Sequence, residues 1–254
     1  MKLRVLGCSG GIGGGLRTTA LLLDDDILID GGTGVGDLTL EELRRIDHVF
    51  VTHSHLDHVA CIPFLLDSVG ALRERPVTLY ASNETIATLR AHLFNWKLWP
   101  DFSVIPNASA PIMRFQPIAL GEAVHLGART LRSLPACHVV PAVGYHVDSG
   151  TGSLVFTGDT GPCEARWEAI NRIGNLRYLI VETAFSNAEG ALAAASKHLT
   201  PDLLAQELAL LHARPEIYIT HLKPVDGRST MQEVSRVAAA WMPRMLEHGQ
   251  VLEF

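Results

Sequence analysis

Four side chains of the kind that bind metal ions fall within six positions, at His53, His55, Asp57 and His58, directly after the apolar run Val49–Val51. His53 and His55 are two residues apart, so in extended chain both side chains project to the same side. Asp57 and His58 lie where the chain turns into the next expected helix, directed at a neighbouring point. This spacing suits two adjacent metal ions rather than one.

Three further residues of the same kind follow apolar segments that read as strands. Asp159 comes after Ser153–Thr157, His221 comes after Ile217–Thr220, and His138 follows a strand ending at Pro135. Taken alone, the aspartate could equally serve a turn or cap a helix, and a single histidine more often has a structural role. Because all three follow predicted strands, we expect them to meet the first four residues at one edge of the sheets.

The elements that must position these residues form a β-rich first half, followed by alternating helices and strands. Strands are predicted at Lys2–Leu6, Thr19–Leu23, Ile27–Ile29, Asp47–Thr52, Val77–Tyr80, Met113–Pro117, Ala123–Leu126, Thr130–Pro135, Ala142–Val147, Ser153–Thr157, Tyr178–Glu182 and Ile217–Thr220. Helices are predicted at Leu38–Arg44, Val59–Leu72, Glu84–Leu93, Glu164–Ile173, Pro201–Ala213 and Thr230–Met242. This order predicts an α/β fold of two packed sheets with helices outside, a four-layer α/β/β/α sandwich.

We assign residues 1–254 to a single domain. An insertion is expected around residues 94–112, where aromatic residues and prolines occur without a clean period. The glycine-rich run Gly7–Gly15 is interpreted as a tight strand connection near the site. It lacks the spacing and the following acidic residue of a nucleotide-binding loop.

Composition limits the class of substrate. The 254 residues are 47% hydrophobic and 19% charged, which is typical of a globular protein, and the formal net charge is −6. Lysines and arginines are scattered, whereas proteins that grip long nucleic acids usually carry a basic stripe. We therefore expect a small-molecule substrate and no DNA partner, and the charge disfavours RNA.

The four cysteines show no Cys-x-x-Cys spacing, and we interpret them as reduced thiols of a cytoplasmic protein. No run approaches the roughly 20 apolar residues that a membrane span requires, so no membrane partner is expected.

The pattern His-x-His-x-Asp-His, with a later histidine, a Gly-Asp-Thr aspartate and a final histidine, resembles the metallo-β-lactamase superfamily. The resemblance implies that His53, His55 and His138 hold one metal ion, that Asp57, His58 and His221 hold the other, and that Asp159 bridges them. The β-lactamases proper commonly carry a cysteine ligand where this chain has Asp159, which argues against the antibiotic-degrading branch. Zinc is favoured, with manganese or iron left open because these ligands suit several divalent ions. Cys137, beside His138, is expected to be a buried neighbour rather than a ligand.

Within the superfamily, three segments resemble the class II 3′,5′-cyclic-nucleotide phosphodiesterases: His53–His58, His198-Leu199-Thr200-Pro201 and His221-Leu222-Lys223-Pro224. The insertion containing Trp96 and Trp99 also resembles that group, with either packing or contact to a nucleobase as the role of these two residues. The resemblance implies an enzyme, a metal-dependent hydrolase that converts a 3′,5′-cyclic nucleotide to the 5′-nucleotide.

The catalytic residues expected on this basis are Asp57, Glu182 and His198. Phosphodiester hydrolysis needs a nucleophile, neutralisation of charge on the phosphoryl oxygens and a proton for the leaving oxygen. Two metals supply the first two needs, and Asp57 would orient the nucleophile. His198, oriented by Glu182 as in the related tRNA 3′-processing nucleases, would supply the proton. The alternative role for His198 is to cap the helix that begins at Pro201.

Three other functions are alternatives: a tRNA 3′-processing-type endoribonuclease, a lactone or thioester hydrolase of the same fold, and a catalytically silent metal-binding scaffold. The acidic net charge and the lack of a long basic arm disfavour the nuclease. A lactone or thioester hydrolase has less use for His198, and the full ligand set disfavours the scaffold. A homodimer is favoured by analogy and by the frequency of twofold assemblies.

Overall fold

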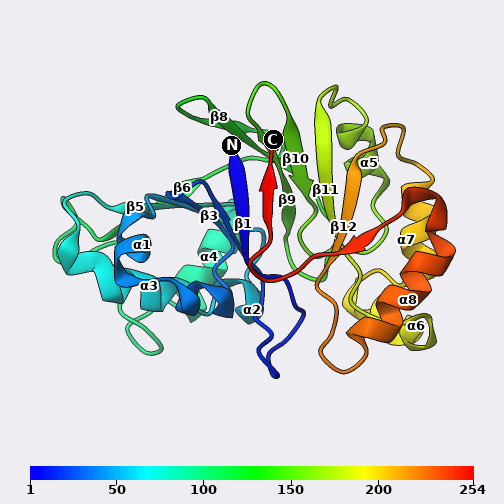
Figure 1. Cartoon of the computed structure of the whole chain (residues 1–254). Helices are drawn as coiled ribbons and strands as arrows, with labels where there is room; N and C mark the ends of the chain where they lie inside the picture. The colour runs from blue at the N-terminus through cyan, green and yellow to red at the C-terminus, as the bar shows by residue number, and fades with distance from the viewer.

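Two seven-stranded β-sheets pack face to face, and helices cover the outer face of each (Figure 1). The computed structural model describes residues 1–254. The first sheet contains, in spatial order, β14 (Val251–Glu253), β1 (Lys2–Gly7), β2 (Ala20–Leu23), β3 (Ile27–Ile29), β4 (His48–Phe50), β5 (Val77–Ala81) and β6 (Met113–Pro117). Strands β3 to β6 run parallel, so their carboxyl ends share one edge of the sheet.

The second sheet mixes antiparallel and parallel strands in the same way. Its spatial order is β13 (Arg244–Met245), β12 (Glu216–Thr220), β11 (Leu176–Glu182), β10 (Ser153–Phe156), β9 (Val143–Asp148), β8 (Arg129–Pro135) and β7 (Ala123–Leu126). The four strands from β10 to β13 are parallel. Their carboxyl ends therefore also meet at a single edge, which is where the candidate site lies.

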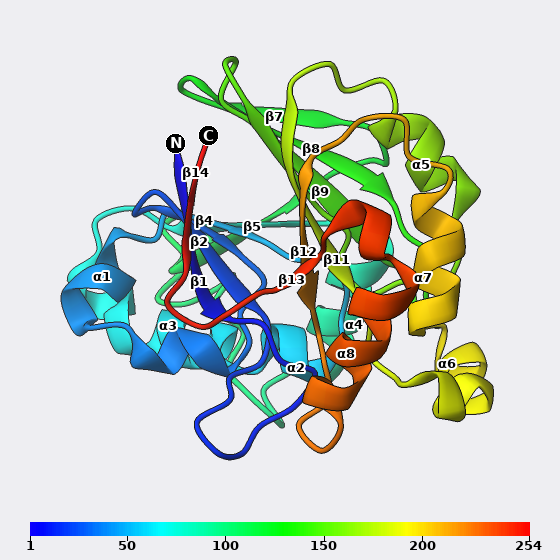
Figure 2. The ribbon, with the colours of Figure 1, turned by 45° about the vertical axis from the view of Figure 1, so that its right-hand side comes forward.

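The helices form the two outer layers. They are α1 (Leu40–Arg45), α2 (Leu56–Val59), α3 (Ile62–Val69), α4 (Asn83–His92), α5 (Glu164–Ile170), α6 (Gly190–Ser196), α7 (Pro201–Leu208) and α8 (Gly227–Val237), with short 3-10 turns at Thr33–Asp37, Gly70–Leu72, Asn187–Glu189 and Ala239–Trp241. Helices α1, α3 and α4 lie outside the first sheet, and α5, α7 and α8 lie outside the second (Figure 2). The predicted four-layer sandwich is confirmed.

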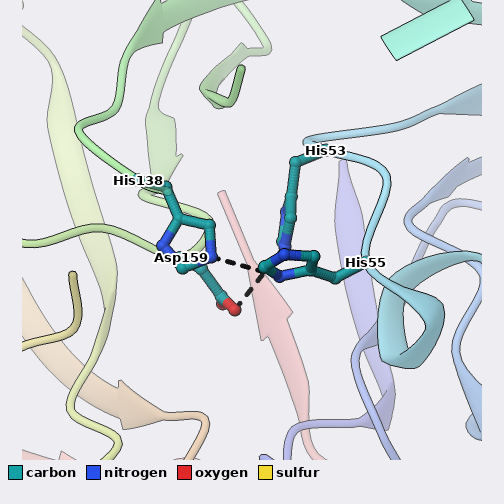
Figure 3. Close-up of side chains that lie close together, drawn as sticks. All are labelled: His53, His55, His138 and Asp159. Atoms are coloured by element: carbon teal, nitrogen blue, oxygen red, sulfur yellow. Dashed lines mark hydrogen bonds and ion pairs between the residues drawn. The ribbon is translucent and has the colours of Figure 1, made fainter. Parts of the chain in front are cut away.

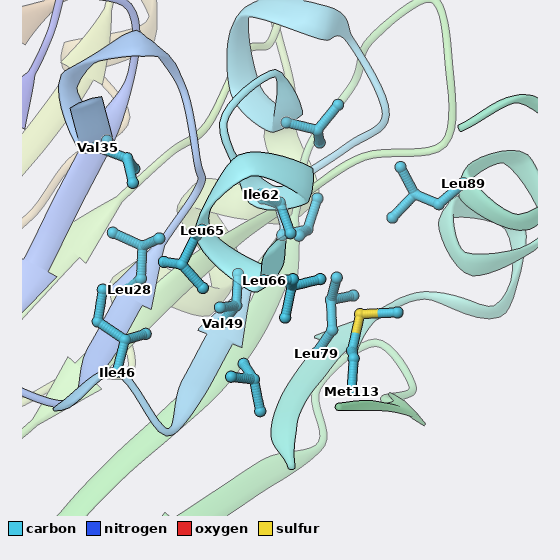
Figure 4. Packing of buried hydrophobic residues seen from close by; sticks show 14 of the residues in the cluster. Leu28, Val35, Ile46, Val49, Ile62, Leu65, Leu66, Leu79, Leu89 and Met113 are labelled. Atoms are coloured by element: carbon cyan, nitrogen blue, oxygen red, sulfur yellow. The ribbon is translucent and has the colours of Figure 1, made fainter. Parts of the chain in front are cut away.

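Three separate hydrophobic cores hold the four layers together. One of 23 buried residues lies between the first sheet and its helices; there Val49 and Leu79 of the sheet face Leu65 of α3 and Leu89 of α4 (Figure 4). One of 21 residues lies between the two sheets, and one of 15 between the second sheet and its helices. Because a central strand buries both faces, its sequence is continuously apolar, as in Ala20–Leu23.

The helix predicted over Val59–Leu72 is instead two helices, α2 and α3. Pro63 stands in the first turn of α3 and lacks the N–H that a continuous helix would donate to the carbonyl of Val59. The helix therefore stops and restarts at Cys61. This break leaves Asp57 and His58 on the short helix α2 at the edge of the sheets.

The remaining differences concern short elements. Helix α6 and strands β13 and β14 were not predicted. Strand β13 has only two residues and β14 only three, and β14 forms only by pairing with distant β1. Residues 94–112 contain no helix or strand. We propose that they form an insertion within a single domain. None of the helices is both long enough and apolar enough to cross a lipid bilayer.

The core between the sheets offers a test of the packing. Phe50 is fully buried, stacks on Tyr80 at 4.4 Å between ring centroids and meets the edge of Tyr145 at 5.5 Å. Phe50→Ala should lower the free energy of unfolding by about 3–5 kcal/mol, measured by denaturant titration. The control Phe64→Ala removes a ring that is 56% exposed and should cost less than ~1.5 kcal/mol. Equal losses in the two variants would contradict this description of the core.

Candidate metal centre

The strand ends bring all seven predicted ligand residues to one place. His53 follows β4, His138 follows β8, Asp159 follows β10 and His221 directly follows β12. Asp57 and His58 come from α2, which lies below the strand ends of both sheets in Figure 1. Residues separated by up to 168 positions along the chain (221 − 53) therefore share one site.

The first group consists of His53, His55, His138 and Asp159, each with one nitrogen or carboxylate oxygen within 4.8 Å of the others (Figure 3). His138 Nε2 lies 3.2 Å from His55 Nδ1, and His53 Nε2 lies 3.7 Å from Asp159 Oδ2. His55 is half-buried whereas the other three are buried. The group thus opens toward solvent on the side of His55.

The second group consists of Asp57, His58, Asp159 and His221, again with one atom each within 4.8 Å of the others. Asp159 Oδ2 lies 3.3 Å from His58 Nε2, and Asp159 Oδ1 lies 3.3 Å from His221 Nδ1. Asp57 Oδ2 is 3.8 Å from both histidines, at Nε2 of each ring. Asp159 belongs to both groups and is the one residue positioned to bridge two ions.

Buried ring nitrogens test whether a metal fits here. His53 Nε2, His58 Nε2 and His221 Nδ1 are inaccessible to solvent and have no hydrogen-bond partner. An unpaired buried polar atom is costly, so native proteins almost always satisfy it. Three such nitrogens around one carboxylate form a donor set that divalent ions prefer. The two groups of side chains therefore imply bound divalent metal ions.

The electrostatics agree with that requirement. Burial lowers the pKa of His138 to about 4, so the ring is neutral and can donate a nitrogen lone pair. Burial also lowers the pKa of His58, but the charges of Asp159 and Asp30 outweigh it and hold this pKa well above the usual value. Carboxylates that stabilise a protonated imidazole in this way also stabilise a metal cation at the same place.

Asp30 supports the site and was not predicted from the sequence. Its fully buried carboxylate accepts hydrogen bonds from the backbone N–H of Thr52 at 2.8 Å and from the Thr52 hydroxyl at 2.8 Å. The second oxygen is also 2.7 Å from His58 Nδ1, and Thr52 Oγ1 is 3.0 Å from His53 Nδ1. One carboxylate thereby orients a histidine of each group. The only local signal was the pair of glycines that follows this aspartate after an apolar strand.

Glu182 and His198 form a buried pair beside both groups. His198 Nδ1 lies 2.7 Å from Glu182 Oε1, which also accepts the backbone N–H of Thr160 at 2.9 Å. The His198 ring stacks on His221 at 5.3 Å between centroids and meets His138 edge-on at 4.9 Å. Its imidazole therefore lies between one ring of each group.

The alternative role for His198, as cap of the helix at Pro201, is wrong. Thr200 is the N-cap residue of α7, and its side chain accepts the backbone N–H of Leu203 at 3.4 Å. The hydrogen bond of His198 is instead made with Glu182, across to β11.

The structure also tests two predictions about the rim of the site, for Cys137 and for the glycine-rich segment. Cys137 is exposed, so its expected burial is wrong, because it lies on the loop after β8. The predicted passage of Gly7–Gly15 near the site is confirmed, because a Cβ at Gly10 would lie 2.5 Å from the carbonyl oxygen of His221. The connection itself is not tight, since twelve residues separate β1 from β2. Trp99 packs edge-on against Phe64 at 5.1 Å.

The Asp30 network predicts a loss of metal affinity without loss of a ligand. Asp30→Asn keeps the left-handed backbone, φ 57°, which asparagine tolerates, but its amide cannot accept from all the partners that the carboxylate serves. The wild-type protein should bind about two divalent ions per chain, and the variant should bind them roughly 10–100-fold more weakly, measured by competition with a chelator. Asp24→Asn is the control, because Asp24 has a similar φ of 49° but lies in the β2–β3 turn. Equal affinities in wild type and Asp30→Asn would contradict the role.

Comparison with known proteins agrees with this geometry. The sequence model of the beta-lactamase superfamily domain matches residues 26–222. A Yersinia pestis protein named a probable 3′,5′-cyclic-nucleotide phosphodiesterase is 28% identical over 207 residues, covering 71% of this chain and 58% of that protein. The 3′,5′-cyclic-nucleotide phosphodiesterase of Aliivibrio fischeri is 26% identical over 250 residues, covering 81% of this chain and 74% of the relative. The chain thus spans little more than half of the Yersinia protein.

A ribonuclease Z of Parasynechococcus marenigrum is 26% identical over 288 residues, covering 88% of this chain and 87% of the relative. Among solved structures, unliganded yeast PDE1 has a TM-score of 0.83 at 17% identity, covering 100% of this chain and 99% of the other. The metallo-beta-lactamase fold protein YhfI from Bacillus subtilis has a TM-score of 0.76 at 20% identity, covering 99% and 98%. With a family match over most of its length, the chain belongs to the metallo-β-lactamase superfamily.

Proposed function

We propose that this protein hydrolyses a 3′,5′-cyclic nucleotide to the 5′-nucleotide. The observation that carries the proposal is the buried Glu182–His198 pair, with its imidazole between the two groups of metal-binding residues. A hydrolase of phosphodiesters with poor leaving groups needs a proton donor at that position. The names of the Yersinia and Aliivibrio relatives agree with this substrate class.

In this proposal, His53, His55 and His138 would hold one metal ion. Asp57, His58 and His221 would hold the second, and Asp159, which belongs to both groups, would serve both. When bound, two such ions activate water and neutralise charge on the phosphoryl oxygens. Zinc suits the histidine-rich donor set, and manganese and iron are the alternatives that metal analysis would separate.

The chain itself then provides orientation and a proton. The Asp57 side chain is about one-third exposed, the most accessible carboxylate of the centre, and its free oxygen can orient the attacking water. His198 donates the proton on Nε2 to the leaving 3′-oxygen. Glu182 accepts the hydrogen bond from Nδ1 and so fixes the ring in the orientation and tautomer that this step needs.

Protonation of His198 before reaction follows from its surroundings. Burial lowers the pKa of His198, but the hydrogen bond and the charge of Glu182 outweigh burial and raise this pKa above the usual histidine value. Burial raises the pKa of Glu182 as well. Both directions favour a proton on the Glu182–His198 pair.

A second candidate is RNA 3′-end cleavage, favoured by the similarity to ribonuclease Z over nearly the whole chain. The same pair and the same metals would serve that reaction. Against it stands the net charge of −6, since a nuclease that contacts many phosphates depends on basic residues.

Substrate preference is the direct test. Metal-loaded protein should turn over a 3′,5′-cyclic nucleotide faster than precursor tRNA, and the rate should depend weakly on salt because few phosphates are contacted. Product analysis by chromatography should find the 5′-nucleotide, and Asp159→Ala provides the background rate. Efficient tRNA cleavage with a steep loss of binding at higher salt would reverse the ranking of the two functions.

The role of His198 has its own signature. His198→Ala should retain its metal and lose roughly 10²–10⁴-fold in rate on the cyclic nucleotide. The loss should shrink for a nitrophenyl phosphodiester, whose leaving oxygen departs without a proton, and Glu182→Gln should show a milder form of the same pattern.

The matched control for His198→Ala is Thr200→Ala, which removes the cap of α7. This control should cost about 0.5–2 kcal/mol of stability with little change in turnover per folded molecule. If His198→Ala instead loses the same factor on good and poor leaving groups, the proton-donor role is wrong.

A further inference from the structure

Two thiols meet beside the metal centre, from segments 26 residues apart. Cys137 Sγ lies 2.7 Å from Cys163 Sγ, and both cysteines are free. Cys137 immediately precedes His138 on the loop after β8, and Cys163 immediately precedes α5. The pair therefore joins the segment that carries His138 to the segment that follows Asp159.

Backbone hydrogen bonds hold the two sulfur atoms in this position. The Cys137 carbonyl accepts the N–H of Gly161 at 2.8 Å, and the Cys137 N–H donates to Thr160 Oγ1 at 3.0 Å. The N–H of Cys163 donates to the buried carboxylate of Glu207 at 2.9 Å. The contact between the thiols is thus a property of two anchored segments rather than of two free side chains.

The two thiols differ in access. Cys137 is exposed and lines a cavity of about 800 Å³ together with Val139, Pro141 and Lys197. Cys163 is only 4% exposed. A small reagent in solvent can therefore reach Cys137 first, with Cys163 already placed behind it.

We propose that Cys137 and Cys163 are a site of reversible disulfide formation, driven by exchange with a low-molecular-weight disulfide such as oxidised glutathione. The Cys137 sulfur, after losing its proton to solvent, attacks one sulfur of the reagent, forms a mixed disulfide and releases one glutathione thiolate. The Cys163 sulfur, likewise deprotonated, attacks the Cys137 sulfur and releases the second. The two protein thiols are oxidised by two electrons, one glutathione disulfide is reduced to two thiols, and the two protons end on those thiols.

The linkage would connect the loops that carry His138 and Asp159 by a covalent bond. A bond that forms on oxidation and breaks on reduction would then lie at the rim of the metal centre, without using any of the proposed metal-binding side chains. The proposed disulfide does not depend on which substrate the protein takes, because it is detected by mass rather than by activity.

The experiment uses the full metal-loaded chain in glutathione buffers from reducing to oxidising. After acid quench, denaturation and maleimide alkylation, intact mass should show four reactive thiols in reducing buffer. In oxidising buffer, two of the four should be lost together, and peptide mapping should identify a Cys137–Cys163 cross-link that dithiothreitol reverses. Cys61→Ser, the control, should also lose two together.

Single variants separate the two steps. Cys163→Ser should stop at the mixed disulfide, with one glutathione on Cys137, while Cys137→Ser should form neither the adduct nor the cross-link. Cys163→Ala, with thermal melting of both variants, guards against a folding defect at the start of α5. Four reactive thiols in wild type throughout the series, or a cross-link that joins any other pair of cysteines, would overturn the proposal.

Discussion

The whole site depends on burying one carboxylate between three imidazoles. Asp159 is only 2% exposed, with His53, His58 and His221 around it at 3.3–3.7 Å. A carboxylate without water needs positive charge or several donors to be stable. The ring nitrogens nearest to Asp159 are themselves unpaired. Cations between these groups would satisfy the carboxylate and the ring nitrogens at once, and the two sheets must bring their strand ends together to build the site.

Around that carboxylate, buried polar contacts fix each supporting segment. Arg166, fully buried, donates to Thr160 Oγ1 at 2.7 Å and to Glu207 Oε2 at 2.8 Å. Thr160 in turn donates its N–H to Glu182. The loop that carries Asp159 is thus tied to α5 and α7 on one side and to the proposed acid pair on the other. Asp30 does the same for the histidines on the first sheet. Such supports keep the geometry of the proposed ligand residues fixed without being ligands themselves.

Features of the fold and the site that leave a local pattern in the sequence could be predicted, and features that depend on distant residues could not. Apolar strands that end in histidine or aspartate, such as Ile217–Thr220 before His221, give both a local pattern and a location, so the layers and the seven residues were found. Supports such as Glu207 have no such pattern, because their partners lie about 40 residues away, on another helix. The break between α2 and α3 had a local cause in Pro63, which the prediction of one helix over Val59–Leu72 did not take into account. Strand β14 exists only through its pairing with β1.

Chemistry and substrate choice are carried by different parts of this fold. Most of the proposed ligands, and Glu182, end or follow strands whose positions three buried cores fix. His198 lies between α6 and α7 and is held by its hydrogen bond to Glu182. The rim is built from segments outside the strands: the glycine-rich connection, whose Gly13 to Gly15 all have positive φ, and residues 94–112, where Trp96 is 64% exposed. Such loops tolerate change with little cost to the core. Relatives named 3′,5′-cyclic-nucleotide phosphodiesterase and ribonuclease Z both resemble this chain over most of its length, and we expect the rim to supply the contacts that separate such substrates.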